Sequence, residues 1–232
     1  MSSQEETEKI KIRYEKRKSN RSVQDHDAAK SFIFFMSKER ERIYTQLLQK
    51  QFNSRIKNIT LLEIGAGNGG NIAFFKDIGI SASSIYANEL LEDRIQNLRE
   101  NHPEVHILPG DARKLLPDYS QSFDVVFQST VFTSILEPEF KKELADCCLK
   151  LLKPDGMVLW YDFAFDNPKN KDVKGIKKKE IRALFPNCNI AFHKVTLAPP
   201  IGRRVGKLYP VLNALPFLRT HLVAAITPKV IP

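Results

Sequence analysis

Residues 61–70 read LLEIGAGNGG, a short apolar run that passes directly into four glycines. The apolar run over 59–64 predicts a buried strand, and the glycines permit the tight turn between a strand and a helix. A helical pattern over 71–78 follows, so its free backbone N–H groups would face a ligand at the turn. Because ligands of open α/β sheets bind outside the carboxyl ends of the strands, this stretch predicts a ligand site.

Strand and helix patterns alternate along the rest of the chain. Further strand-like runs lie at 85–88, 105–108, 123–128 and 157–162, and helical patterns lie at 28–51, 91–101, 138–152 and 174–185, with a turn at 153–156. This alternation predicts βαβ units and a mostly parallel sheet covered by helices on both faces. Two last strands, 190–197 and 220–226, have no helix between them and are expected to pair antiparallel. The predicted fold class is an α/β three-layer sandwich.

Two segments stand outside this pattern. Residues 1–27 are polar and basic and are interpreted as a separate N-terminal segment, a candidate lid. Residues 28–232 then form a single domain. Within it, residues 198–218 contain four Pro and two Gly and are expected to be an irregular insertion.

Composition bounds the class of protein. The chain has 232 residues, of which 42% are hydrophobic and 27% charged, as in an ordinary globular domain. No apolar run approaches the roughly 20 residues that span a bilayer. The charged N-terminus lacks the apolar core of a secretory signal, so a cytoplasmic location is expected. Three cysteines are too few for a disulfide framework or a zinc site.

The positive charge lies in the last third of the chain. The net charge is +9, and residues 167–232 contain 13 Lys and Arg against two acids, which gives +11. Such a field attracts anionic partners such as phosphates, nucleic acid or an anionic membrane surface. Arg203 and Arg204 lie in the Gly- and Pro-rich segment and are interpreted as ligand contacts.

Three acidic residues near predicted strand ends bear on the identity of the ligand. Glu89 ends the second strand, where a carboxylate can accept hydrogen bonds from both hydroxyls of a ribose. Asp111 follows the third strand and can accept from an amine such as adenine N6. Glu63 precedes the glycines, where it favours a cationic amino-acid end over a pyrophosphate. The glycines also match G-x-G-x-x-G, so a dinucleotide-binding fold remains an alternative.

These residues together resemble the class I S-adenosylmethionine-dependent methyltransferases. The shared features are E-x-G-x-G-x-G at 63–69, the acid at 89, G-D-A at 110–112, F-D-V-V at 123–126 and L-K-P-D-G at 152–156. The resemblance covers about residues 59–226. It implies a Rossmann-like, seven-stranded sheet with the last strand antiparallel, and S-adenosylmethionine as the cofactor.

The resemblance also implies roles for individual residues. Glu63 and the glycines would line the methionine end, Glu89 would hold the ribose, and Asp111 would flank the adenine. The implied cofactor-binding residues are Glu63, Gly65, Ala66, Gly67, Asn68, Glu89, Leu90, Asp111, Ala112 and Gln128.

Methyl transfer from a sulfonium is an in-line displacement, in which the enzyme mainly positions the acceptor. A hydroxyl acceptor also needs a base or a metal ion to remove its proton. Asp162, at the end of a predicted strand, and His193, inside another, are the candidate catalytic residues. The spacing of Asp162, Asp166 and Asp172 is not specific for a cation, and no metal is expected.

Cations and aromatic residues outside the cofactor fold are candidates for acceptor binding, because Arg pairs grip phosphate or carboxylate bidentately. These candidates are Tyr14, Arg17, Arg203, Arg204 and Tyr209. The tail over 161–176 and the A-P-P-I-G-R-R segment resemble small bacterial methyltransferases of sugar, surface-polysaccharide or secondary-metabolite pathways. That likeness implies an anionic small-molecule, nucleotide-sugar or glycan acceptor, methylated at oxygen.

Three other functions remain alternatives. An RNA methyltransferase would use the basic C-terminal third as its electrostatic footprint. An NAD-dependent oxidoreductase would use the glycine loop for a dinucleotide. A non-enzymatic binding module would keep the fold and lose the chemistry, against which the intact loop, Glu89 and Asp111 argue.

Overall fold

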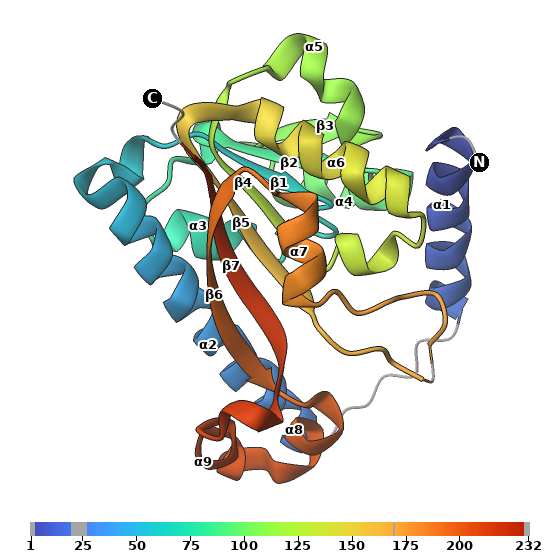
Figure 1. Ribbon diagram of the computed structural model, residues 1–232, viewed down its shortest axis with the longest axis vertical. Coiled ribbons are helices and arrows are strands. Elements are labelled where there is room, and N and C mark those ends of the chain that lie inside the picture. Colours follow the sequence, from blue (N-terminus) through green and yellow to red (C-terminus); the bar gives the residue numbers. More distant parts are fainter. Residues whose placement is uncertain (1–2, 20–26, 169, 230–232) are drawn as a thin grey trace.

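The strand-like runs assemble into one sheet, as a computed structural model shows (Figure 1). The structure describes residues 3–19, 27–168 and 170–229, and the side chains of 3, 4, 17–19, 27 and 28 lie outside this description. The sheet has seven strands in the order β3-β2-β1-β4-β5-β7-β6. Strand β7 pairs antiparallel with β5 and with β6, while the other neighbours pair parallel. The predicted fold class and the antiparallel last strand are confirmed.

The described elements have the following bounds. The strands are β1 (Leu61–Ile64), β2 (Ile85–Glu89), β3 (His106–Pro109), β4 (Phe123–Ser129), β5 (Leu152–Phe163), β6 (Cys188–Leu197) and β7 (Arg219–Pro228). The α-helices are α1 (Ser3–Ser19), α2 (Asp27–Phe52), α3 (Ile72–Asp77), α4 (Glu92–Asn101), α5 (Leu116–Tyr119), α6 (Pro138–Leu151), α7 (Lys178–Leu184), α8 (Pro199–Val205) and α9 (Tyr209–Asn213). The 3-10 turns are η1 (Asn53–Asn58), η2 (Ala82–Ser84), η3 (Ala112–Leu115), η4 (Phe132–Ser134), η5 (Gly206–Leu208) and η6 (Pro216–Leu218).

Each face of the sheet has its own apolar core. Leu62, Ile64 and Trp160 belong to the core under α6 and α7. Leu61 and Tyr161 belong to the core under α2 and α3. Successive side chains of a strand point to opposite faces, so the sheet is buried on both sides as the near-continuous apolar strands predict. Glu63 therefore shares the α2 face with Leu61.

Several predicted boundaries differ from the structure. Residues 153–156, expected as a turn, are part of β5, whose pairing with β4 shifts register between Phe123 and Val125. The helix expected over 174–185 starts at Lys178, because the preceding residues run extended against β5. There the Ile176 N–H donates to the Phe163 carbonyl at 2.9 Å. A Cβ on Gly175 would lie 2.6 Å from the Phe165 backbone, so this approach requires glycine.

The insertion 198–218 is not irregular but forms α8, η5, α9 and η6. Prolines stand at the first turn of α8, α9 and η6, where a missing N–H costs nothing. These helices pack on the first turns of α2 through Phe32 and Tyr209. The insertion joins the carboxyl end of β6 to the start of β7, so it lies at the foot of the molecule in Figure 1.

The segment 1–27 contains helix α1, which lies beside α4 and α6 (Figure 1). Ile10 of α1 joins the core under α6. Over the residues that the structure describes, no helix has the length and apolar character needed to cross a membrane.

Candidate functional site

A cavity of about 460 Å³ opens at the carboxyl ends of β1, β2 and β4. This volume falls in the range of small-molecule sites. Its lining from the sheet edge includes Glu63, Gly65, Ala66, Gly67, Glu89, Leu90, Asp111, Ala112, Ser129 and Thr130, and its lining from helices includes Thr7, Ile10, Tyr14, Arg40 and Arg94. Eight of the ten residues predicted to bind the cofactor thus line the cavity together. Of the other two, Asn68 is exposed, and Gln128 is fully buried and does not line the cavity.

The glycine loop forms one wall of this cavity. Gly65 and Gly67 have φ of +66° and +61°, where residues with a Cβ are strained. The loop is tied to the neighbouring strand because the Ala66 N–H donates to the Asn88 carbonyl at 2.9 Å. A Cβ on Gly67 would meet no atom within 4 Å, so the space above it is open to a ligand.

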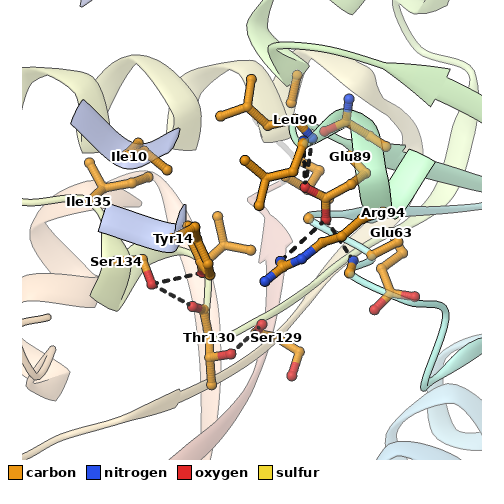
Figure 2. A pocket seen from close by; sticks show the side chains of 18 of the residues that line it. Ile10, Tyr14, Glu63, Glu89, Leu90, Arg94, Ser129, Thr130, Ser134 and Ile135 are labelled. Atoms are coloured by element: carbon orange, nitrogen blue, oxygen red, sulfur yellow. Dashed lines mark hydrogen bonds and ion pairs between the residues drawn. The ribbon is translucent and has the colours of Figure 1, made fainter. Parts of the chain in front are cut away.

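Glu89 lies in the cavity lining beside Leu90 and Arg94 (Figure 2). Its carboxylate accepts from the Gly67 N–H and the Leu90 N–H, both at 2.8 Å, and from the Leu91 N–H at 3.0 Å. The Arg94 guanidinium lies 3.8 Å from the same carboxylate. These contacts hold the carboxylate in one place and join the glycine loop to the end of β2.

Asp111 lines the cavity beside the end of β3. Its carboxylate accepts from the backbone N–H of Arg113 at 3.0 Å, and the Arg113 guanidinium pairs with it. The Asn88 side chain donates to the Leu108 and Gly110 carbonyls, both at 2.9 Å, and so fixes the turn that carries Asp111. The carboxylate that was predicted to accept from an adenine amine is therefore already engaged on one side by an arginine.

Glu63 carries a buried carboxylate with unused hydrogen-bonding capacity. Its Oε1 accepts from the Asn71 side chain at 2.7 Å, and its Oε2 has no hydrogen-bond partner among the described atoms. Only 1% of its surface is exposed, and burial raises its pKa to about 8. The positive charge of Arg40 on α2 acts against this rise. A buried acid with an unpartnered oxygen can accept a hydrogen bond from a cationic group of a ligand.

Glu63→Gln is expected to stabilise the ligand-free protein increasingly from about pH 5 upward, with the full gain reached above about pH 8. The pKa of Glu63 is higher in the folded protein than its ordinary value of 4.5, so the folded state holds the extra proton between pH 4.5 and about 8. The wild-type free energy of unfolding therefore falls as the pH rises through that window. The amide removes this loss, which reaches about 5 kcal/mol near pH 9.

Urea unfolding near pH 5 and near pH 9 measures this effect. The wild type and Glu63→Gln should have similar free energies of unfolding near pH 5, and Glu63→Gln should be the more stable near pH 9. Glu92→Gln, which changes an exposed acid of α4, is the control and should show no such pH-dependent gain. Equal stabilities of wild type and Glu63→Gln near pH 9 would contradict a buried, uncompensated carboxylate.

The turn after β4 forms the opposite wall. Thr130 has φ of +59°, an uncommon conformation for a β-branched residue. Gln128, fully buried behind it, accepts from the Val131 N–H at 3.1 Å and donates to the Tyr161 carbonyl at 3.3 Å. Gln128 therefore supports the wall from behind, and the cavity is lined by Ser129, Thr130 and Val131.

Asp162 also lies behind this wall, outside the lining residues. Its Oδ1 accepts from the Thr133 hydroxyl, and its Oδ2 has no hydrogen-bond partner among the described atoms. It is 1% exposed, and burial raises its pKa to about 7. The candidate base is thus next to the cavity wall but separated from the cavity by η4.

Helix α1 covers the cavity and is anchored by a buried ion pair. Glu6, 2% exposed, accepts from the Leu136 N–H at 3.0 Å and from Arg13 at 2.7 Å. Tyr14 places its hydroxyl 3.1 Å from the Ser134 hydroxyl, and the Arg94 guanidinium lies 4.6 Å from its ring centre. Figure 2 shows Tyr14 between the wall of the β4 turn and Arg94.

The other predicted site residues lie away from the cavity. His193 is on β6 at the far edge of the sheet, and burial lowers its pKa. Tyr209 is 2% exposed and packs on Phe32, with its hydroxyl accepting from the Leu197 N–H at 3.2 Å. Arg203 and Arg204 are exposed on α8 and do not line the cavity. The side chain of Arg17 lies outside the described residues.

Sequence reasoning missed the helical contributors Arg40, Arg94, Thr7 and Ile10. Arg94 lies five residues after Glu89, on the helix that follows it. This short separation could have indicated a contact between the two side chains. Arg40 had no such signal, because α2 precedes the first strand in the chain and reaches the cavity through its tertiary packing on the sheet.

Comparisons with known proteins show what the chain is similar to. The family model described as a methyltransferase domain matches residues 62–160. The rat protein named thiol S-methyltransferase TMT1B is 27% identical over 138 residues, which are 58% of this chain and 53% of the relative. The match therefore spans about half the length of this curated relative.

Solved structures share the fold. A 1,6-didemethyltoxoflavin-N1-methyltransferase from Burkholderia thailandensis, with bound S-adenosylhomocysteine, superposes with a TM-score of 0.58 at 18% identity, over 82% of this chain and 79% of that one. A SAM-dependent methyltransferase from Archaeoglobus fulgidus superposes with a TM-score of 0.54 at 18% identity, over 85% and 99%. The chain is thus similar over residues 62–160 to the methyltransferase domain, and it shares its fold with S-adenosylmethionine-dependent methyltransferases.

Proposed function

We propose that the cavity under α1 holds S-adenosylmethionine and that the chain transfers its methyl group to a small acceptor. The observation that carries this proposal is the buried Oε2 of Glu63, which has no described partner and suits the ammonium of the methionine end. Glu89 would accept from the ribose hydroxyls, and Asp111 would flank the adenine. The open space over Gly67 leaves room for the cofactor to approach the backbone.

The cofactor supplies an electrophilic methyl group, and the protein must position the acceptor and exclude water. Helix α1 fits this task because Glu6 and Arg13 fix it against the turn after β4. Ile10 and Tyr14 then present an apolar and aromatic surface to the cavity. In this proposal α1 acts as the candidate lid of segment 1–27.

We further propose that the acceptor is a small, mainly apolar thiol. Among the described lining residues, the carboxylates of Glu89 and Asp111 are bonded to backbone N–H groups and arginines, and Glu63 is buried beneath the loop. None is placed as an acceptor-side base. A cysteine-like thiol, with a pKa of about 8.5, is partly ionised near neutral pH without a base, and thiols in general ionise far more readily than alcohols. The relative named as a thiol S-methyltransferase supports the same choice.

An anionic acceptor methylated at oxygen is the second candidate. The observation in its favour is Asp162, a carboxylate whose pKa of about 7 suits a general base. Against it, the Arg203 and Arg204 pair assigned to the anion lies outside the cavity. An RNA acceptor has the same difficulty, since the exposed cations of α7 and α8 do not line the cavity.

The two candidates are separated by a matched pair of acceptors. The purified protein is incubated with methyl-labelled S-adenosylmethionine and either 2-phenylethanethiol or 2-phenylethanol. We expect labelled thioether, at a rate that rises with pH toward the pKa of the thiol, and at most about 1% of that rate with the alcohol. Asp162→Asn should keep the thiol rate within about threefold.

A faster reaction with the alcohol, lost in Asp162→Asn, would overturn the thiol proposal and establish the second candidate. Label that enters only an RNase-sensitive fraction of a cell extract would move the acceptor to RNA. Label in any product shows that methyl transfer occurs, and the product that carries the label identifies the acceptor. Methyl transfer itself is therefore tested separately from the identity of the acceptor.

A further inference from the structure

Apolar side chains gather on a lobe at one end of the molecule. We define the apolar lobe as residues 31–36 of α2 together with the insertion 198–218. Over the described residues, six of the nine exposed large apolar side chains lie here: Ile33, Phe34, Leu208, Val211, Leu215 and Phe217. Phe217 is 73% and Val211 is 68% exposed. Apolar exposure of this density marks an interaction surface more often than a chance arrangement.

Ring contacts join the two parts of the apolar lobe into one unit. Phe34 packs edge-on against Phe35, with ring centres 5.5 Å apart, and Phe35 stacks on Tyr209, also at 5.5 Å. A Cβ on Gly202 would lie 2.4 Å from the Phe32 ring, so α8 lies directly against α2. The lobe is thus a rigid support for side chains that point outward.

The positive charge of the insertion indicates which kind of partner the apolar lobe fits. Residues 198–218 contain Arg203, Arg204 and Lys207 and no acidic residue. All three cations are exposed. A second copy of the same lobe would bring like charges together, and an RNA would leave the apolar side chains in water. An anionic lipid surface satisfies both features, because acyl chains accept the apolar groups and headgroups accept the cations.

We propose that the apolar lobe docks the protein on anionic membranes. Phe217, Val211 and Leu208 enter the interface, and Arg203, Arg204 and Lys207 bind the lipid headgroups. The start of β7 lies beside the carboxyl end of β5, with His221 opposite Phe163. The lobe is therefore at the same edge of the sheet as the cavity, and docking brings that edge toward the membrane (Figure 1).

The experiment is co-sedimentation of the full chain with vesicles. One set contains phosphatidylcholine alone and the other an equal mixture of phosphatidylcholine and phosphatidylserine. We expect binding to the mixed vesicles, and weaker binding as salt is added. Val211→Ser with Phe217→Ser should reduce binding about tenfold or more through lost apolar burial. Arg203→Glu with Arg204→Glu should also reduce it about tenfold or more.

Matched controls separate the lobe from general effects of charge and hydrophobicity. Lys177→Glu with Lys179→Glu makes the same charge change at exposed positions beside and on α7, and Ile12→Ser removes an exposed apolar side chain of α1. Both should bind as the wild type does. Melting curves of all variants show whether each is folded.

Several results would overturn the proposal. One is equal loss of binding in the Lys177 and Lys179 control, which would mean attraction by net charge alone. Another is absence of wild-type binding to mixed vesicles. A third is a wild-type protein that forms dimers in sedimentation analysis and does not bind vesicles. If the Val211 and Phe217 changes abolish those dimers, the partner of the lobe is a second copy of the chain. Methyl transfer to a soluble thiol is measured in parallel and does not depend on any of these outcomes.

Discussion

Replacing Glu89 with alanine is expected to weaken S-adenosylmethionine binding by about 100-fold or more. The change removes the carboxylate that is proposed to accept from two ribose hydroxyls, and hydrogen bonds to charged groups contribute about 1.5–3 kcal/mol each. It also leaves the Gly67 and Leu90 N–H groups without their present acceptor. Calorimetric titration of the variant with S-adenosylmethionine measures the loss.

Two further variants sharpen this test. Glu89→Gln keeps the shape and one acceptor oxygen, so its loss should be intermediate. Glu92→Gln changes an exposed acid three residues along the chain and should bind the cofactor as the wild type does. Wild-type affinity in a folded Glu89→Ala protein would show that Glu89 does not hold the ribose.

Gly67→Ala is expected to reduce cofactor affinity by about 10- to 100-fold while the protein remains folded. The added methyl group meets no protein atom within 4 Å, so it enters the space assigned to the cofactor. The φ of +61° costs an alanine roughly 1–2 kcal/mol, which lowers the melting temperature by only a few degrees. Titration and thermal unfolding of the same sample separate the two effects.

Gly206→Ala is the matched control for backbone strain. Gly206 has φ of +50°, and a Cβ there also meets no atom within 4 Å, but it lies in the insertion away from the cavity. It should lose stability and keep full cofactor affinity. Equal losses of affinity in the two variants would mean that strain, and not occupied ligand space, explains the effect at Gly67.

The sequence predicted the parts of the fold and site that depend on local patterns. The apolar strand patterns and the glycine turns were sufficient to predict the sheet strands and the antiparallel last strand, because both are local features of the sequence. The same logic located Glu63, Glu89 and Asp111, since the carboxyl ends of parallel strands meet at one edge of the sheet. Helix starts were less well predicted, as at 174–185, where contact of Gly175 with the Phe165 backbone keeps the chain extended.

Long-range packing set the rest of the site and could not be predicted from sequence. Arg40 reaches the cavity from α2, which packs on the sheet face that also carries Glu63, and Tyr14 reaches it because Glu6 anchors α1 at Leu136. The positive charge of 198–218 was assigned to an acceptor, but its helices pack on α2 through Tyr209 and carry the cations to a different surface. Composition alone could not distinguish these two placements.

The claim that Glu63, Gly67 and Glu89 hold an S-adenosyl cofactor is tested most directly by calorimetric titration with S-adenosylhomocysteine and, separately, with NAD. Titration in two buffers of different ionisation enthalpy also counts protons. We expect one S-adenosylhomocysteine per chain, proton release near neutral pH as the Glu63 carboxyl ionises beside the ligand ammonium, and no heat from NAD. Tighter binding of NAD, or no binding of S-adenosylhomocysteine, would contradict the assignment of the cavity.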